Sequence, residues 1–198
     1  MKYFTYLILL IGLFSCLSIK QAFLKGENYV VYSIDHSVEP LIDSLQTKKH
    51  TVLLGAMELS LKEDGIELNK NKSGKLKSFM TLVSGKGNFV RINGFIGFSS
   101  TIGFETTIMN NLSESRFTVT SDQSEIYTLN RKDSVFTTGL RVPSKSSSLI
   151  LTKKPTFKKG DIIKGIVELE SEEFYILKRR KLKEYKAKIK AYFSITIN

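Results

Sequence analysis

The chain contains few of the residues on which many functional motifs depend. Among its 198 residues there are one cysteine, Cys16, two histidines, His36 and His50, three prolines and no tryptophan. A single cysteine excludes an intrachain disulfide and a metal site built from cysteines. Neither histidine has a second histidine at metal-binding spacing, so the sequence predicts no zinc site and no Cys/His nucleophile. We therefore assign no catalytic residue, no metal ligand and no cofactor.

Enzyme signatures are missing as well. The sequence has no G-x-S-x-G elbow, P-loop or dinucleotide fingerprint. Gly85-Lys86-Gly87 has the composition of a phosphate loop, but it lies between two expected strands, and we interpret it as a turn. Glu168 and Glu170 are expected on the outer face of a strand, opposite a lysine-rich strand, with Glu172 and Glu173 in the following turn. The sequence thus favours a non-enzymatic protein.

What the chain does contain is typical of a basic β-protein. Hydrophobic residues make up 41% of the sequence, and 13 Phe and 8 Tyr accompany many Ile, Val and Thr residues. The formal net charge is +11 and the pI about 9.6. Such a charge favours anionic partners, among which are phospholipid surfaces, acidic glycans and nucleic acid.

Short apolar runs recur along the chain at intervals that indicate antiparallel strands. Met57, Leu59 and Leu61 alternate with polar residues, and Asp64-Gly65 is a hairpin turn signal. A first strand is expected within Asn28–Ile34 and a helical turn within Glu39–Leu45. Turn-rich segments, including Pro143–Ser146, are expected to separate the further strands, which are Phe79–Val83, Phe89–Ile92, Phe95–Phe98, Ile102–Ile108, Arg116–Thr120, Glu125–Leu129, Val135–Val142 and Ser148–Thr152.

The C-terminal part has the clearest pattern. From Tyr185 to Ile197 every odd position is apolar, which indicates one long strand with a core face and a solvent face. In Ile162–Glu170, Ile163, Val167 and Leu169 share one face. The sequence therefore predicts an all-β fold after an N-terminal signal helix: an antiparallel β-sandwich, with a barrel as the alternative.

The N-terminus has the layout of a secretory signal. Lys2 precedes an uncharged segment, Tyr3–Ile19, with an apolar centre at Leu7–Ile11. Three interpretations follow: a lipoprotein signal cleaved before Cys16, an ordinary signal cleaved, for example, after Ser18, and an uncleaved membrane anchor.

Leu13-Phe14-Ser15-Cys16 resembles the lipobox of bacterial lipoproteins, because a leucine stands three residues before the cysteine and a small residue directly before it. The resemblance implies cleavage before Cys16, acylation of its thiol, and a lipid-anchored location in the cell envelope that faces the periplasm or the cell surface. The resemblance covers only the first 16 residues. Together with the strand pattern it gives the expected domain organisation: a signal peptide at 1–15, a spacer with a candidate first strand at 16–47, and a β-sandwich at 48–198.

The main electrostatic feature is a basic stretch near the C-terminus. It contains a candidate contact surface for anionic partners, which is made of Lys178, Arg179, Arg180, Lys181 and Lys183. Lys186, Lys188 and Lys190 continue it, and Lys153, Lys154, Lys158 and Lys159 are expected to join it on one positive face. Anionic lipid, acidic glycan or an envelope protein would be the partner, since export disfavours nucleic acid. The competing interpretation is a solvated edge strand whose lysines prevent aggregation.

These observations predict a lipid-anchored binding or structural module of the cell envelope. The alternatives are a secreted hydrolase, a glycan-binding protein with a basic contact face, and a subunit whose edge strand pairs with a partner. A hydrolase requires convergent carboxylates in a pocket, whereas a glycan-binding protein requires exposed aromatic side chains in a groove.

Overall fold

Strands occupy most of the chain, as its alternating apolar and polar residues predict. The computed structural model describes residues 29–47, 55–68, 76–98, 100–122, 125–132 and 136–197. The predictions for the signal segment, for Cys16 and for His50 lie outside these residues. Within the described residues no helix is long and apolar enough to cross a bilayer.

Thirteen strands are present in this part of the chain, and they confirm the all-β class. They are β1 (Val30–Val31), β2 (Ser33–Ile34), β3 (Gly55–Glu63), β4 (Ile66–Leu68), β5 (Lys77–Lys86), β6 (Phe89–Ile96), β7 (Thr101–Met109), β8 (Leu112–Thr120), β9 (Ile126–Thr128), β10 (Gly139–Leu151), β11 (Ile162–Ser171), β12 (Phe174–Lys178) and β13 (Lys181–Thr196).

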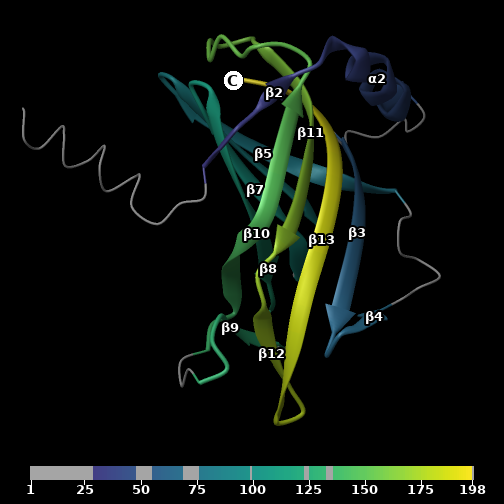
Figure 1. Ribbon diagram of the computed structural model, residues 1–198, viewed down its shortest axis with the longest axis vertical. Coiled ribbons are helices and arrows are strands. Elements are labelled where there is room, and N and C mark those ends of the chain that lie inside the picture. Colours follow the sequence, from purple (N-terminus) through teal and green to yellow (C-terminus); the bar gives the residue numbers. More distant parts are fainter. Residues whose placement is uncertain are drawn as a thin grey trace, which may run out of the picture.

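The strands form two layers that share β10, in the antiparallel sandwich arrangement that the sequence predicts. We name as layer A the strands β5, β6, β7 and β8 with the first part of β10. Layer B contains the rest of β10 followed by β11, β13 and β3, with β4, β9 and β12 at its margins. In Figure 1, β10, β11, β13 and β3 lie in front, and β5 and β7 cross behind them. The start of β5 also pairs with β3, so hydrogen bonding passes between the layers at both sides.

Large apolar side chains fill the space between the layers. Phe79 and Phe104 of layer A meet edge to face with centroids 5.5 Å apart, and Phe117 contacts Phe174 of layer B at 5.3 Å. All seven odd-numbered residues from 185 to 197 are buried, which confirms the period-two prediction for β13. Burial of these rings supplies much of the apolar area removed from water on folding.

The prediction of a turn at Pro143–Ser146 is wrong. β10 continues through this segment, pairing Pro143 with Arg116 of layer A and Ser146 with Glu170 of layer B. The pairing shifts between Ser144 and Ser146, as in a β-bulge. A bulge bends a strand and tolerates a proline that lacks a donor, so this segment redirects β10 from one layer to the other. Likewise Phe89–Ile92 and Phe95–Phe98, expected as separate runs, contribute to the single strand β6.

The hairpin turns agree in part with the sequence. Of Gly85-Lys86-Gly87, expected as a turn, Gly85 and Lys86 end strand β5 and only Gly87, with a φ of +70°, lies in the turn that leads to β6. The Asp64–Gly65 turn between β3 and β4 has φ values of 47° and 80°, the left-handed conformation that this residue pair favours.

The predicted helical turn is a helix, α2 (Glu39–Thr47), which follows a short 3-10 turn, η1 (His36–Val38), where His36 is exposed. α2 covers one end of the outer face of layer B (Figure 1). There Ile42 is buried against Ile166 and Tyr192. Beside these residues, the Lys164 ammonium lies 2.8 Å from both the Glu39 and the Asp43 carboxylates.

β13 is not an edge strand, which corrects the competing interpretation of its lysines. β3 pairs with it on one side over Tyr185–Phe193. β11 and then β12 pair with it on the other side. Lys186, Lys188 and Lys190 therefore lie on the outer face of the middle of a sheet, whereas Lys181 and Lys183 precede the pairing with β3 and pair with β12.

Candidate functional site

The sequence-predicted contact residues form one β-hairpin. β12 and β13 are joined by the two-residue turn Arg179–Arg180, with Lys178 paired to Lys181. Both arginines have a left-handed backbone, with φ values of 47° and 63°. Such turns favour Asn-Gly or Asp-Gly, because a Cβ atom in this conformation costs about 1–2 kcal/mol per residue. The Asp64–Gly65 turn follows that preference, and the Arg179–Arg180 turn does not.

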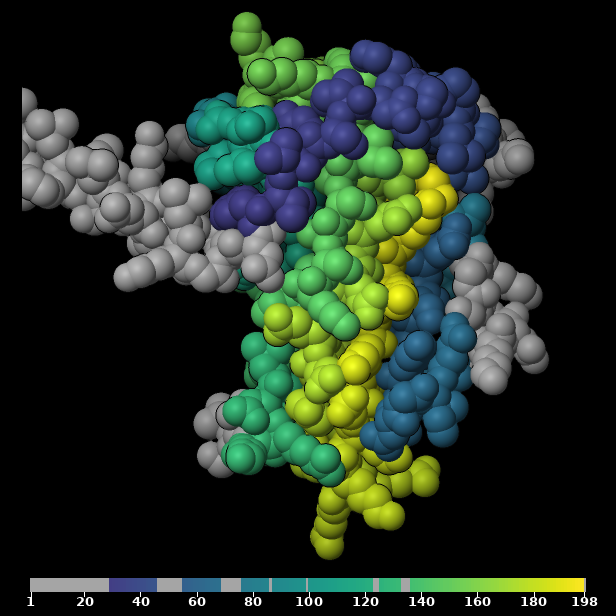
Figure 2. Space-filling view, in the orientation of Figure 1, coloured from purple at the N-terminus to yellow at the C-terminus, as the bar shows by residue number. Residues whose placement is uncertain are grey.

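The hairpin borders an open hollow of about 700 Å³, which we name the hairpin hollow. It is lined by Glu63, Glu125, Leu177, Lys178, Arg179, Lys181 and Lys183. Four of the five predicted contact residues thus surround one space, and the fifth, Arg180, completes the adjacent turn. In Figure 2 the hairpin protrudes from the lower end of the molecule.

Two of its lysines are paired with carboxylates. The Lys183 ammonium is 2.6 Å from a carboxylate oxygen of Asp64 and 3.5 Å from one of Glu63. The hydrogen bond from Lys183 holds the pKa of Asp64 below its ordinary value and raises the pKa of Lys183. Lys178 lies 3.3 Å from Glu125.

Two buried tyrosines support the hollow from behind. The Tyr185 hydroxyl donates a hydrogen bond to Glu63, and the Tyr127 hydroxyl donates one to Glu125 over 3.1 Å. Burial raises the pKa of Tyr185, and burial together with Glu125 raises the pKa of Tyr127 to about 12. Both phenols therefore stay protonated donors at neutral pH. Because each carboxylate is held by a phenol and a lysine, their geometry disfavours an acid–base pair of the kind a hydrolase uses.

The basic stretch is divided into a paired part and an unpaired tip. Along β13 the ammonium groups of three lysines lie 2.7–2.9 Å from glutamates: Lys186 with Glu173, Lys188 with Glu170 and Lys190 with Glu168. Among the described residues, Arg179, Arg180 and Lys181 have no ion-pair partner. Within this basic stretch, the positive charge without a carboxylate partner is thus concentrated at the tip of the hairpin.

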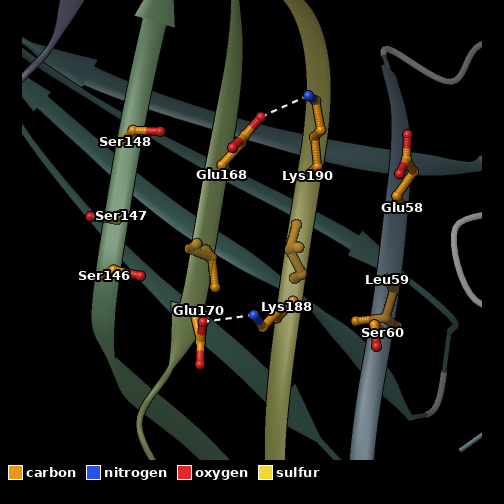
Figure 3. Close-up of a pocket in the computed structure, with 12 residues that line it drawn as sticks. Glu58, Leu59, Ser60, Ser146, Ser147, Ser148, Glu168, Glu170, Lys188 and Lys190 are labelled. Carbon is orange, nitrogen blue, oxygen red and sulfur yellow. Dashed lines mark ion pairs between the residues drawn. The ribbon is translucent and has the colours of Figure 1, made fainter. Parts of the chain in front are cut away.

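The paired lysines form a charge ladder across the outer face of layer B. Figure 3 shows Glu168 pointing to Lys190 and Glu170 to Lys188, which confirms the predicted cross-strand arrangement. This ladder borders a shallow hollow of about 600 Å³ that also includes Glu58, Ser60, Ser146 and Ser148. Each pair is largely exposed and contributes only a few tenths of a kcal/mol. The ladder neutralises itself and offers little net charge to a partner.

The second lysine group does not join the hairpin, so the expectation of one positive face is wrong. The loop with Lys153, Lys154, Lys158 and Lys159 lies beside the far end of β13, where Gly160 donates a backbone hydrogen bond to Ile197. Lys181 begins the 16-residue strand β13 at its other end. At about 3.3 Å per residue the two basic groups lie roughly 50 Å apart along the strand.

Sequence reasoning missed the carboxylates and tyrosines of the hairpin hollow. Tyr185 was expected to face the core, but its contact with Glu63 depends on the pairing of β13 with β3. Only that long-range register would have revealed it. The structure also shows a buried carboxylate, Glu105, between Arg91 and Arg141 on layer A. No sequence motif predicts it. Among the described residues, no group of three or more His, Cys, Asp and Glu side chains is placed to hold a metal ion.

Comparisons with protein-family models, curated proteins and solved structures found no match for this chain. The fold and the site together define an antiparallel β-sandwich with a cationic hairpin at one end.

Proposed function

We propose that the protein is a lipid-anchored, non-enzymatic binding module of the bacterial cell envelope, and that its β12–β13 hairpin contacts an acidic glycan. The observation that carries the proposal is the Arg179–Arg180 turn. Its two residues are unfavourable for the backbone conformation that they adopt, and they place positive charge where no carboxylate of the described residues neutralises it. Strained residues of this kind concentrate at functional sites.

The position of the hairpin favours a glycan over the membrane of the anchor. Ile34 of β2 pairs with Leu151, which lies in the same cross-strand row as Gly165 and Phe193. That row is separated from Lys181 by roughly 40 Å of strand. β2, through which the described chain leads back towards Cys16, therefore lies at the opposite end of layer B from the cationic hairpin. An anchored molecule would extend its hairpin away from the bilayer, where acidic polymers of the envelope are accessible.

The anchor is tested with Cys16→Ala. Leu13, Ser15 and Cys16 support acylation at this position. We expect the variant to lose fatty-acyl labelling and to move from the membrane fraction to the soluble fraction, because two or three acyl chains are needed for stable attachment. The measurement is labelling with an alkyne fatty acid and fractionation of expressing bacteria. A variant that labels and fractionates like the wild type contradicts the anchor.

The contact is tested with the double variant Arg179→Asn/Arg180→Gly. We expect its affinity for immobilised alginate, an acidic polysaccharide, to fall at least tenfold at low salt, because two unpaired charges are removed. Its free energy of unfolding should rise by about 1–2 kcal/mol, since Asn-Gly suits the turn. Surface plasmon resonance and urea denaturation measure the two effects.

The matched control is Lys188→Gln/Lys190→Gln, which removes the same net charge from the ladder. It should retain most of the affinity for alginate, because those lysines are already paired. Equal losses in both double variants would show that net charge alone governs binding and would refute the hairpin site. Binding to phosphatidylglycerol vesicles with none to alginate would refute the glycan and identify a membrane contact.

A further inference from the structure

The outer face of layer A carries a second hollow, and no residue of the hairpin is part of its lining. Its volume is about 570 Å³, and side chains of β5, β6, β7, β8 and β10 border it. We name it the layer A hollow, and its principal residues are Leu82, Asn93, Phe95, Glu105, Thr118 and Arg141.

The space exists because glycines interrupt the rows of outward side chains. Phe95, Gly103, Thr118 and Arg141 follow one another across four strands, so no side chain separates Phe95 from Thr118. Gly103 cannot be replaced, since a Cβ there would lie 1.9 Å from a backbone oxygen of Gly94. The depression is therefore fixed by the close approach of two strands.

A buried carboxylate lies in this hollow. Glu105 is 6% exposed, although it is on the outer face of the sheet. One of its oxygens is 3.3 Å from the Arg141 guanidinium and 4.0 Å from Nε of Arg91. Nε of Arg91 is buried and has no hydrogen-bond partner among the described atoms. Arg91 does not itself line the hollow, so Arg141 is the guanidinium that a ligand there would meet.

Other polar groups in the hollow are also available. Within the described part of the chain, no hydrogen bond engages the side chains of Asn93 and Thr118, which line it. Phe95 is half-buried, and Leu82, which is 63% exposed, adds an apolar surface. The hollow thus combines a carboxylate acceptor, the guanidinium donor of Arg141, side chains that both donate and accept hydrogen bonds, and an apolar wall.

We propose that the layer A hollow binds a neutral saccharide. An anionic ligand would meet the Glu105 carboxylate, and a cationic ligand would meet the Arg141 guanidinium. An apolar ligand would leave all the polar groups unpaired. Sugar hydroxyls both donate and accept, so they satisfy Glu105, Asn93 and Arg141 together, while the C–H face of a pyranose ring packs on Phe95. The volume lies within the range of small-molecule sites.

The proposal is tested by screening the protein against an array of neutral and acidic oligosaccharides, followed by titration of the isotope-labelled protein with the best neutral binder. We expect the side-chain amide signals of Asn93 to shift. Asn93→Ala should weaken binding at least tenfold. Gly139→Val should do the same by filling the hollow, since a Cβ there would lie 3.4 Å from the Thr120 side chain and 3.9 Å from the Val119 backbone oxygen, without a severe clash.

The hairpin variant Arg179→Asn/Arg180→Gly is the control, and its affinity for the neutral saccharide should be unchanged. Circular dichroism and thermal unfolding establish that each variant is folded. Absence of neutral binders would overturn the proposal. So would Asn93→Ala and Gly139→Val variants that bind the saccharide as tightly as the wild type. Binding of acidic oligosaccharides alone, abolished by the hairpin variant, would overturn it too while supporting the hairpin as the contact site.

Discussion

Individual residues at the hairpin hollow are coupled through Glu63. The hydrogen bond from Tyr185, together with Lys183, holds the pKa of Glu63 below its ordinary value. A carboxylate with a lowered folded-state pKa stabilises the fold above its unfolded pKa of about 4.3. That contribution is lost as the pH falls through the folded-state pKa.

We therefore expect Glu63→Gln to lower the free energy of unfolding by about 1 kcal/mol at pH 7, and the difference from the wild type to shrink below about pH 4. Urea denaturation at pH 7, 5 and 3 measures it. Glu58→Gln, on the outer face of the same strand, is the control and should be nearly neutral at all three values. A Glu63→Gln variant as stable as the wild type at pH 7 would contradict this account.

Some of the individual residues of the hairpin hollow can be predicted from the sequence. The five basic residues are contiguous enough to be recognised as a group, and the inward direction of Tyr185 follows from its place in an alternating strand. Glu63 and Glu125 could not be predicted as their neighbours, because they are brought there by pairing of strands that are far apart in the chain. The left-handed Arg179–Arg180 turn was equally hidden, since arginine is unfavourable in that conformation.

Among the elements, α2 stabilises the fold through one localised packing contact. It buries Ile42, which is 1% exposed, on Ile166 and Tyr192 of layer B. Ile42→Ala should lower the free energy of unfolding by about 2–4 kcal/mol, because the truncation leaves a cavity under the helix.

The matched control on the same helix is Leu41→Ala. Leu41 is 47% exposed, so its truncation should change stability by less than about 0.5 kcal/mol. Thermal or urea unfolding of the two variants separates burial from helix propensity, which is the same for both substitutions within a few tenths of a kcal/mol. Equal effects would show that the packing of α2 contributes little.

The elements also show where periodicity succeeds and where it fails. β13 follows from strict alternation, and the Asp64–Gly65 hairpin follows from its turn residues. β10 does not, because Pro143-Ser144-Lys145-Ser146 resembles a loop, although in the structure it accommodates a bulge between two layers. The edge position expected for β13 was wrong for a related reason: alternation reveals which face is buried but not how many neighbours a strand has.

For the whole molecule, the strand composition and spacing were sufficient to predict an antiparallel sandwich. They were insufficient to predict how the two layers join or which basic residues share an end. Both properties depend on the order of strands in the sheet, and that order places the lysines of residues 153–159 and the hairpin at opposite ends of β13.

The pairing of β3 with β13 also affects when the fold can form. Tyr185 and Glu63 are 122 residues apart in the chain, and β13 contributes hydrogen bonds to three other strands. Layer B therefore cannot assemble until residues 181–196 have been synthesised, and contacts at such long separation form slowly. A chain that stays unfolded until its last strand has been synthesised can still pass through a translocation channel. Such a delay in closure would suit the export that we propose for this protein.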